Sequence, residues 1–353
     1  MSVLLHCRSG FEKECAAEVQ AAAQSLGVPG YAKARPNEAL VQFVPADPAS
    51  LPALESGLRL DALVFARQVL FGVSLVDGLP QGDRVGPLVE RARQSGRTFA
   101  GVEVETADTD AAKELSTLCR KLTPPLAAAA KKAALVAGAE TADAPRLTAV
   151  FIGPTAAYVG WTVPGNRSEW PMGIPRLKFP PGAPSRSTLK LAEAIVTFFP
   201  EDAQRRARLK AGMRAVDLGA SPGGWTYQLV DRGMHVTAVD NGSMDPALMA
   251  TGLVDHVHAD GFRYRPEQSV DWMVCDMVEQ PSRVAALVAR WIGEGDCKAS
   301  VFNWKLPMKK RLDEVVRCRE IVEAAARKVG PRLRVRVKQL FHDREEVTGY
   351  VGE

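Results

Sequence analysis

The 353-residue sequence has no long hydrophobic run, no paired cysteine motif and little net charge. A membrane-spanning helix is read from about 18 or more consecutive apolar residues, and no such run occurs, so we expect no membrane span. Charged residues at Arg8, Glu12 and Lys13 come too early for a secretory signal peptide. The six cysteines form no CxxC pair and no zinc-binding spacing, which is typical of reduced thiols. We therefore expect a cytoplasmic protein of two or three domains.

Excess positive charge is also missing. The formal net charge is only +4, so a nucleic-acid surface has to come from local basic patches. The sharpest patch is residues 332–338, RLRVRVK, where a period of two puts the four basic side chains on one face of a strand. A charged edge strand has the same pattern, so an RNA contact and an edge strand both remain open.

The dinucleotide-binding fingerprint Gly-x-Gly-x-x-Gly is absent as well. Residues 214–233, RAVDLGASPGGWTYQLVDRG, instead predict a buried strand closed by an acid, a glycine-rich turn, and a helix from Trp225 to Val230 that Gly233 ends. This unit opens a doubly wound α/β sheet, in which ligands bind beyond the carboxyl ends of the strands. Because no diphosphate fingerprint is present, a nucleotide-dependent oxidoreductase is disfavoured.

A second acid indicates a nucleoside ligand. The predicted strand 235–239 ends at Asp240, and an acid at this position accepts hydrogen bonds from ribose hydroxyls. The glycine turn and Asp240 together favour S-adenosylmethionine. A structural turn or a surface acid would account for either feature alone.

The segment DLGASPGGW, residues 217–225, resembles the Rossmann-fold RNA ribose 2′-O-methyltransferases of the FtsJ type. The resemblance runs over residues 185–352 and implies a Rossmann-like class I methyltransferase sheet with an antiparallel last strand. Within that family, the chain is most similar to bacterial 23S ribosomal RNA cytidine 2′-O-methyltransferases with an N-terminal THUMP domain. The implied partner is therefore 23S ribosomal RNA, methylated at a cytidine of the peptidyl-transferase region.

Four charged residues fall at strand ends or a helix start, where the groups of an open α/β site gather. The resemblance assigns them to the family's catalytic tetrad: Lys190, Asp276, Lys305 and Glu346. For S-adenosylmethionine it implies contacts from Ser187, Ser221, Pro222, Gly223, Gly224, Asp240, Asp260 and Asp276. Ser187 is also expected to cap the helix that follows it.

The tetrad has a physical rationale. A sulfonium already activates its methyl group, so the protein has to align the reactants and take the hydroxyl proton, with no metal ion. An ordinary lysine is protonated at pH 7. The hypothesis that Lys305 is the general base therefore requires a lowered pKa, which we expect from burial and from the neighbouring Lys190, although Asp276 and Glu346 act in the opposite direction. Asp276 and Lys190 would orient Lys305 and the ribose, and Glu346 would complete the network.

His256 and His258 alternate on one strand and are expected to be ordinary strand residues rather than metal ligands.

Four segments are expected along the chain. Residues 1–50 predict a ferredoxin-like subdomain of strand, helix and strand, and residues 51–163 an α+β, THUMP-like RNA-binding domain. The proline-rich residues 164–184 predict a linker, and residues 185–353 the methyltransferase domain. A helix over 110–137 is expected to break at Pro124-Pro125.

Two other functions stay open at this point. The same reaction on transfer RNA or another structured RNA is compatible with every motif. A non-catalytic RNA-binding protein of this fold is disfavoured, because binding alone does not need Lys190 and Lys305. We expect the protein to act as a monomer.

Overall fold

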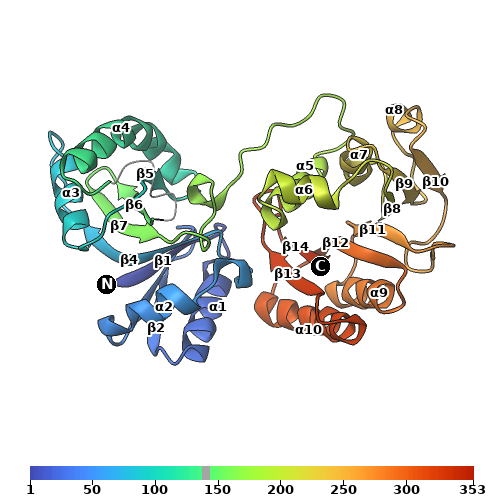
Figure 1. Ribbon diagram of the computed structural model, residues 1–353, viewed down its shortest axis with the longest axis horizontal. Helices are drawn as coiled ribbons and strands as arrows, with labels where there is room; N and C mark the ends of the chain where they lie inside the picture. Colours follow the sequence, from blue (N-terminus) through green and yellow to red (C-terminus); the bar gives the residue numbers. More distant parts are fainter. Residues whose placement is uncertain (137–143) are drawn as a thin grey trace. The chain divides into compact units, whose positions relative to one another are not determined.

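The computed structural model describes residues 1–136 and 144–353, which form two compact units, Met1–Ile174 and Pro175–Glu353. Each unit is built on a seven-stranded sheet (Figure 1). Within the described ranges, no helix combines the length and the hydropathy that crossing a membrane would require. The six cysteines are buried thiols.

The first unit has the strand order β2-β3-β1-β4-β7-β6-β5. Its strands are β1 Ser2–His6, β2 Gly30–Ala34, β3 Leu40–Pro45, β4 Gln68–Val76, β5 Gly101–Thr106, β6 Arg146–Gly153 and β7 Ala156–Thr162. Its α-helices are α1 Glu12–Ser25, α2 Leu51–Gly57, α3 Val85–Arg93 and α4 Ser116–Lys132. Short 3-10 turns cover Pro48–Ser50, Leu60–Ala62, Ala111–Leu115 and Pro171–Gly173. Because β1 pairs with both β3 and β4, one sheet continues across residue 50.

Two details of this unit differ from the sequence-based expectation. The strand β2 was not expected, since GYAKA shows neither an apolar run nor alternation. The predicted break at Pro124-Pro125 is wrong, because α4 runs through both prolines. The helix buries Cys119, Leu126 and Ala130, and this packing outweighs the backbone hydrogen bonds that the prolines remove. Ala137, the last residue of the expected helix, lies outside the described residues.

The second unit has the order β10-β9-β8-β11-β12-β14-β13. Its strands are β8 Arg214–Leu218, β9 His235–Val239, β10 Val254–Val257, β11 Val270–Cys275, β12 Cys297–Lys305, β13 Arg334–Lys338 and β14 Glu346–Gly352. The first five in the sheet are parallel, and β14 runs antiparallel to β12 and β13. This is the expected Rossmann-like methyltransferase sheet with an antiparallel last strand.

Helices cover both faces of this second sheet. They are α5 Thr188–Phe198, α6 Asp202–Arg208, α7 Gly224–Val230, α8 Pro246–Met249, α9 Pro281–Gly293 and α10 Arg311–Val329. Figure 1 shows α5 and α7 on one face and α9 and α10 on the other. The apolar side chains of α5, Leu191, Ile195 and Phe198, are buried in one core cluster with Trp272 and Tyr350. Phe199, which follows α5, meets Tyr350 edge-to-face with ring centroids 5.1 Å apart. This packing fixes α5, and with it Lys190, on the sheet.

The basic strand 332–338 includes β13, the edge strand of the second sheet. The guanidinium of Arg336 lies over the rings of Phe198, Phe199 and Tyr350, at 5.1 to 5.7 Å from their centroids. Arg336 therefore packs on the core, as the edge-strand interpretation requires.

Candidate active site

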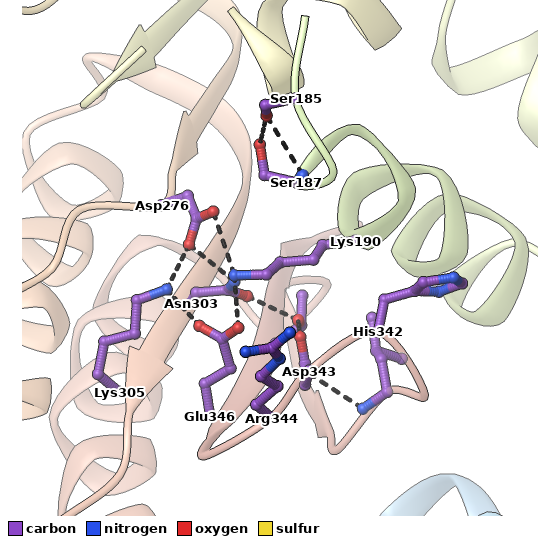
Figure 2. Close-up of polar contacts among 12 residues, drawn as sticks. Ser185, Ser187, Lys190, Asp276, Asn303, Lys305, His342, Asp343, Arg344 and Glu346 are labelled. Atoms are coloured by element: carbon purple, nitrogen blue, oxygen red, sulfur yellow. Dashed lines mark hydrogen bonds and ion pairs between the residues drawn. The ribbon is translucent and has the colours of Figure 1, made fainter. Parts of the chain in front are cut away.

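The four charged residues of the predicted tetrad form a closed ring (Figure 2). The Lys305 Nζ lies 2.6 Å from Asp276 Oδ1 and also donates to Glu346 Oε2. The Lys190 Nζ pairs with Glu346 Oε1 and lies 3.4 Å from Asp276 Oδ2. Each lysine thus contacts both carboxylates, and positive and negative charges alternate around the ring. The side chains are between 6% and 24% exposed, so solvent screens the ring only weakly.

Strand register brings these residues together. Lys305 ends β12 and pairs directly with Glu346 at the start of the antiparallel β14. Asp276 follows β11, whose Cys275 pairs with Phe302 of the parallel β12. Lys190 comes from the first turn of α5. The site therefore lies at the carboxyl edge of the parallel strands, where an open α/β sheet binds its ligands.

The pKa of Lys305 moves in the direction opposite to the expectation. Burial acts to lower the pKa of Lys305, but the charges and hydrogen bonds of Asp276 and Glu346 outweigh burial and raise it above the ordinary lysine value. The expected lowering by burial and Lys190 is wrong for this arrangement, because two carboxylates touch the ammonium directly. Lys305 is therefore held as a charged donor within the closed ring.

A second layer of buried polar side chains, which sequence analysis did not identify, lies behind Asp276. Asn303 Nδ2 donates to Asp276 Oδ1 at 2.9 Å, and Thr348 Oγ1 donates to Asn303 Oδ1 at 2.6 Å. The same hydroxyl lies 3.0 and 3.1 Å from the two carboxyl oxygens of Asp343, and Asp343 Oδ2 also accepts a hydrogen bond from the Leu340 N–H. Burial, followed by the charge of Glu346, raises the pKa of Asp343 well above its usual range.

Glu193 ties α5 to the turn between β13 and β14. Its carboxylate accepts hydrogen bonds from the backbone N–H groups of Phe341 and His342 at 2.7 and 2.9 Å, and contacts His342 Nδ1 at 2.6 Å. Glu193 is only 2% exposed. An acid inside the buried half of an otherwise apolar helix was the available sequence signal for this anchor.

The glycine turn after β8 has the backbone conformation that its sequence predicts. Gly219 and Gly223 have φ values of 78° and 117°, which favour glycine. The carboxylate of Asp240 crosses to this turn, accepting from Ser221 N at 3.1 Å and from Gly242 N at 2.7 Å. Since β9 neighbours β8, Asp240 and the turn form one backbone-lined edge.

Asp217 lies under the turn and is 1% exposed. Its Oδ2 accepts a hydrogen bond from Thr226 Oγ1 at 2.7 Å, whereas Oδ1 has no hydrogen-bond partner among the described residues. Burial raises the pKa of Asp217 to about 7, even though the Thr226 hydrogen bond opposes the shift. A titratable acid thus supports the turn from inside the core.

The remaining predicted ligand residues lie around the same edge, with less definite contacts. Ser187 does not cap α5 as expected: its backbone is helical, and its hydroxyl shares a 2.6 Å hydrogen bond with Ser185 Oγ. Asp260 is exposed and accepts from Phe262 N at 2.9 Å. Pro222 and Gly224 belong to the glycine turn and the start of α7. His256 Nε2 lies 3.0 Å from the Asp240 carbonyl oxygen.

Among the described residues, no three or more His, Cys, Asp or Glu side chains cluster in a way suited to a metal ion. The site is instead two adjoining regions at one sheet edge. We call residues Lys190, Asp276, Lys305 and Glu346 the charged ring, and residues 219–224 with Asp240 the glycine edge. The charged ring suits proton and charge chemistry, while the glycine edge suits a neutral, hydroxyl-rich ligand.

Known protein families match three segments of this chain. The sequence model of the RlmM ferredoxin-like domain matches residues 1–70. Residues 83–163 match the sequence model of the N-terminal region of ribosomal RNA large subunit methyltransferase M. Residues 183–350 match the sequence model of the FtsJ-like methyltransferase. The ribosomal RNA large subunit methyltransferase M of Methylococcus capsulatus is 51% identical over 350 residues, which is 99% of this chain and 97% of that protein. Proteins of the same name from Aromatoleum aromaticum and Thauera aminoaromatica are 49% and 48% identical, over 99% of this chain and 94% and 95% of theirs.

Proposed function

The chain belongs to the ribosomal RNA large subunit methyltransferase M family, and we propose that it methylates the ribose 2′-hydroxyl of a cytidine in 23S ribosomal RNA. The target lies in the peptidyl-transferase region, and the methyl donor is S-adenosylmethionine. The observation that carries this proposal is the charged ring, in which Lys190 and Lys305 each contact Asp276 and Glu346. A protein that only binds RNA gains nothing from two lysines that both pair with the buried Glu346 and the partly buried Asp276.

The glycine edge supports the choice of cofactor. Asp240 is held by two backbone N–H groups, and each of its oxygens retains a lone pair for a ribose hydroxyl. The turn beside it has positive φ values at Gly219 and Gly223, and the side chains of Met277 and Leu248 occupy the space that a Cβ would need there. Only glycine therefore lets the backbone bend this tightly beside Asp240. The residues proposed to hold S-adenosylmethionine are Ser187, Ser221, Pro222, Gly223, Gly224, Asp240, Asp260 and Asp276.

When bound, S-adenosylmethionine supplies a methyl group already activated on a positively charged sulfur, so the proposed transfer needs no metal ion. What remains for the protein is to orient the ribose oxygen and to take its proton. Lys305 is the proposed proton acceptor, because it lies at the strand end with two oriented hydrogen-bond partners. Lys190 holds Glu346 and Asp276 in place from the other side of the ring and offers a cation to the ribose oxygen.

The charge state of Lys305 adds a condition to this mechanism. The closed ring keeps Lys305 protonated, so the lysine must lose a proton before it can accept one. A positive charge bound beside Asp276 would compete with Lys305 for this carboxylate and would lower the Lys305 pKa. Lys305, whose side chain is 24% exposed, could then release its proton to solvent water. We propose that the base forms in this way once the site is filled.

The RNA is proposed to contact both units. Residues 51–163 would act as a THUMP-like domain that binds structured RNA by its shape. Residues 1–50 would form a ferredoxin-like subdomain, and residues 164–184 a linker. The methyltransferase domain, 185–353, would add sequence-independent phosphate contacts from its basic residues. We propose that the protein works as a monomer in the cytoplasm.

The experiment that tests this function maps 2′-O-methylation on ribosomal RNA from cells with and without the protein. We expect one cytidine of 23S ribosomal RNA to lose its methyl group and to regain it when the gene is restored. Calorimetry should show binding of S-adenosylmethionine and no binding of NADH. An unchanged ribosomal map together with a lost methyl group on transfer RNA would replace the proposed substrate by the other one.

A further inference from the structure

The second layer behind the charged ring is built on the same pair of strands as the ring itself. Lys305 pairs with Glu346, and two residues further along the ladder Asn303 pairs with Thr348. Residues two apart on a strand share a face, so the two pairs are successive rungs on one side of the sheet. Both Asn303 and Thr348 are 0% exposed, and no described motif uses them.

The direction of the hydrogen bonds in this layer follows from counting protons. Asp276 Oδ1 accepts from Lys305, so the Asn303 atom 2.9 Å from it has to be the amide nitrogen. The Asn303 oxygen then faces Thr348, which donates its one hydroxyl proton across 2.6 Å. No proton of Thr348 is left for Asp343, although both Asp343 oxygens lie within 3.1 Å of the hydroxyl.

An ionised Asp343 would then turn a negative oxygen toward a lone pair of Thr348. The donor left to Asp343 is the Leu340 N–H at 3.0 Å, and within the described part of the chain no ion pair of Asp343 occurs at salt-bridge distance. The side chain is 0% exposed, so an unpaired charge here would be costly. If Asp343 carries the proton instead, it donates to Thr348, and each polar side chain from Asp276 to Asp343 has a hydrogen-bond partner of the right kind.

The opposite arrangement requires the Asn303 amide to be reversed. Thr348 could then donate to an ionised Asp343, but the Asn303 oxygen would face the Asp276 carboxylate at 2.9 Å. Two acceptors at that distance repel each other, and Asp276 would lose a donor. The geometry therefore favours a neutral Asp343.

We propose that Asp343 is a buried neutral carboxylic acid and a positioning residue, which acts through Thr348 and Asn303 to hold Asp276 in the orientation that Lys305 uses. The groups that face Asp343 agree with this: Glu346 and Glu193 act against its ionisation, and the attraction of Lys190 does not reverse their effect or that of burial. The catalytic part of the inference rests on the proposed function, whereas the protonation of Asp343 can be measured without any substrate.

The protonation state is tested by infrared difference spectroscopy of the full chain, wild type against Asp343→Asn, at neutral pH without ligands. Asparagine can donate to Thr348 and accept from Leu340, as the neutral acid does. We expect the wild type to show a protonated carboxylic acid band that the variant lacks. Loss of carboxylate bands alone in the variant would overturn the proposal, whatever reaction the protein catalyses.

The positioning role is tested with a matched pair at Thr348. Thr348→Val keeps the shape but removes the hydroxyl, and we expect kcat to fall about tenfold, with the KM for RNA and the Kd for S-adenosylmethionine changed less than about twofold. Thr348→Ser and Asp343→Asn should both stay within about threefold of wild-type kcat. The control is Thr162→Val in the first unit, where the buried hydroxyl has no hydrogen-bond partner among the described residues.

Equal losses of kcat in Thr348→Val and Thr348→Ser would overturn the positioning role, and so would a Thr348→Val enzyme with unchanged kcat. Thermal unfolding of each variant separates a folding defect from a catalytic one. If Thr348→Val is too unstable to assay, the pair Asp343→Asn and Asp343→Leu decides: the positioning role requires that asparagine keep turnover and that leucine, which cannot donate to Thr348, lower it. If no variant and no wild-type enzyme methylates RNA, the proposed function fails while the infrared result still stands.

Discussion

The charged ring and the glycine edge occupy one sheet edge but are held in place by different means. In the ring, side chains hold side chains, and each charge has two partners of opposite sign. At the glycine edge, backbone N–H groups hold the one acid, Asp240. We therefore expect loss of Lys190, Lys305 or Glu346 to impair chemistry and leave cofactor binding intact, and damage to the glycine edge to do the reverse; Asp276, which is proposed to contact both, should affect both.

The largest expected effect comes from Lys305→Ala. If Lys305 takes the hydroxyl proton, its loss should lower kcat by about a hundredfold to ten-thousandfold. The Kd for S-adenosylmethionine by calorimetry should change little, because the glycine edge stays intact. A matched control is Lys298→Ala, which removes an exposed lysine of the same strand that pairs with Asp271; its kcat should match the wild type. Retained turnover in Lys305→Ala would remove Lys305 from the role of base.

The pH dependence of turnover distinguishes a charged from a neutral lysine in the ring. Because Asp276 and Glu346 raise the Lys305 pKa, only a small fraction of the lysine is neutral at pH 7. We expect kcat, measured with saturating RNA and cofactor, to rise with pH by up to about tenfold per unit below the pKa that Lys305 has in the filled site. A kcat that is flat between neutral and alkaline pH would show that loss of the lysine proton does not limit the reaction.

A smaller effect is expected from Asp240→Asn at the glycine edge. Asparagine keeps one acceptor oxygen, so one of the two backbone N–H groups and part of the ribose contact are lost. The Kd for S-adenosylmethionine should rise about tenfold to a hundredfold, since hydrogen bonds to a charged group contribute about 1.5–3 kcal/mol. The kcat at saturating cofactor should stay near the wild-type value. A fall in kcat with unchanged Kd would contradict the division between ring and edge.

The smallest effect on turnover is expected from Asp217→Asn, which is best followed by stability. The folded pKa of Asp217 is about 7, above its ordinary value of 3.8. Its contribution to stability is therefore fully present below about pH 4 and is lost as the pH rises toward 7. Urea unfolding at mildly acidic and mildly alkaline pH should show a weaker pH dependence in the variant. An identical pH dependence in both proteins would contradict the raised pKa.

Much of the second sheet could be predicted from sequence, because its strands are short apolar runs that end in an acid or a turn. The glycine turn was equally accessible, since few residue types adopt the φ values of Gly219 and Gly223. The gathering of Lys190, Asp276, Lys305 and Glu346 agrees with the expected strand-end geometry. Their roles in catalysis stay predictions.

Other features depend on geometry that a linear pattern does not contain. The sign of the Lys305 pKa shift results from a balance between burial and two touching carboxylates. Asn303, Thr348 and Asp343 are ordinary polar residues in the sequence, and only the register of β12 against β14 brings them together. The uninterrupted α4 likewise reflects tertiary packing rather than propensity.

The pairing of β12 with β14 has a practical consequence for protein engineering. Because one alignment of these strands sets both the 305–346 and the 303–348 pairs, a shift by a single residue would turn all four side chains away together. The two strands should therefore be transferred to another protein only as one unit. A designer who moves the lysine–glutamate pair into another scaffold should carry the asparagine–threonine pair with it, and a chimera joining these strands from distant relatives should be checked at all four positions.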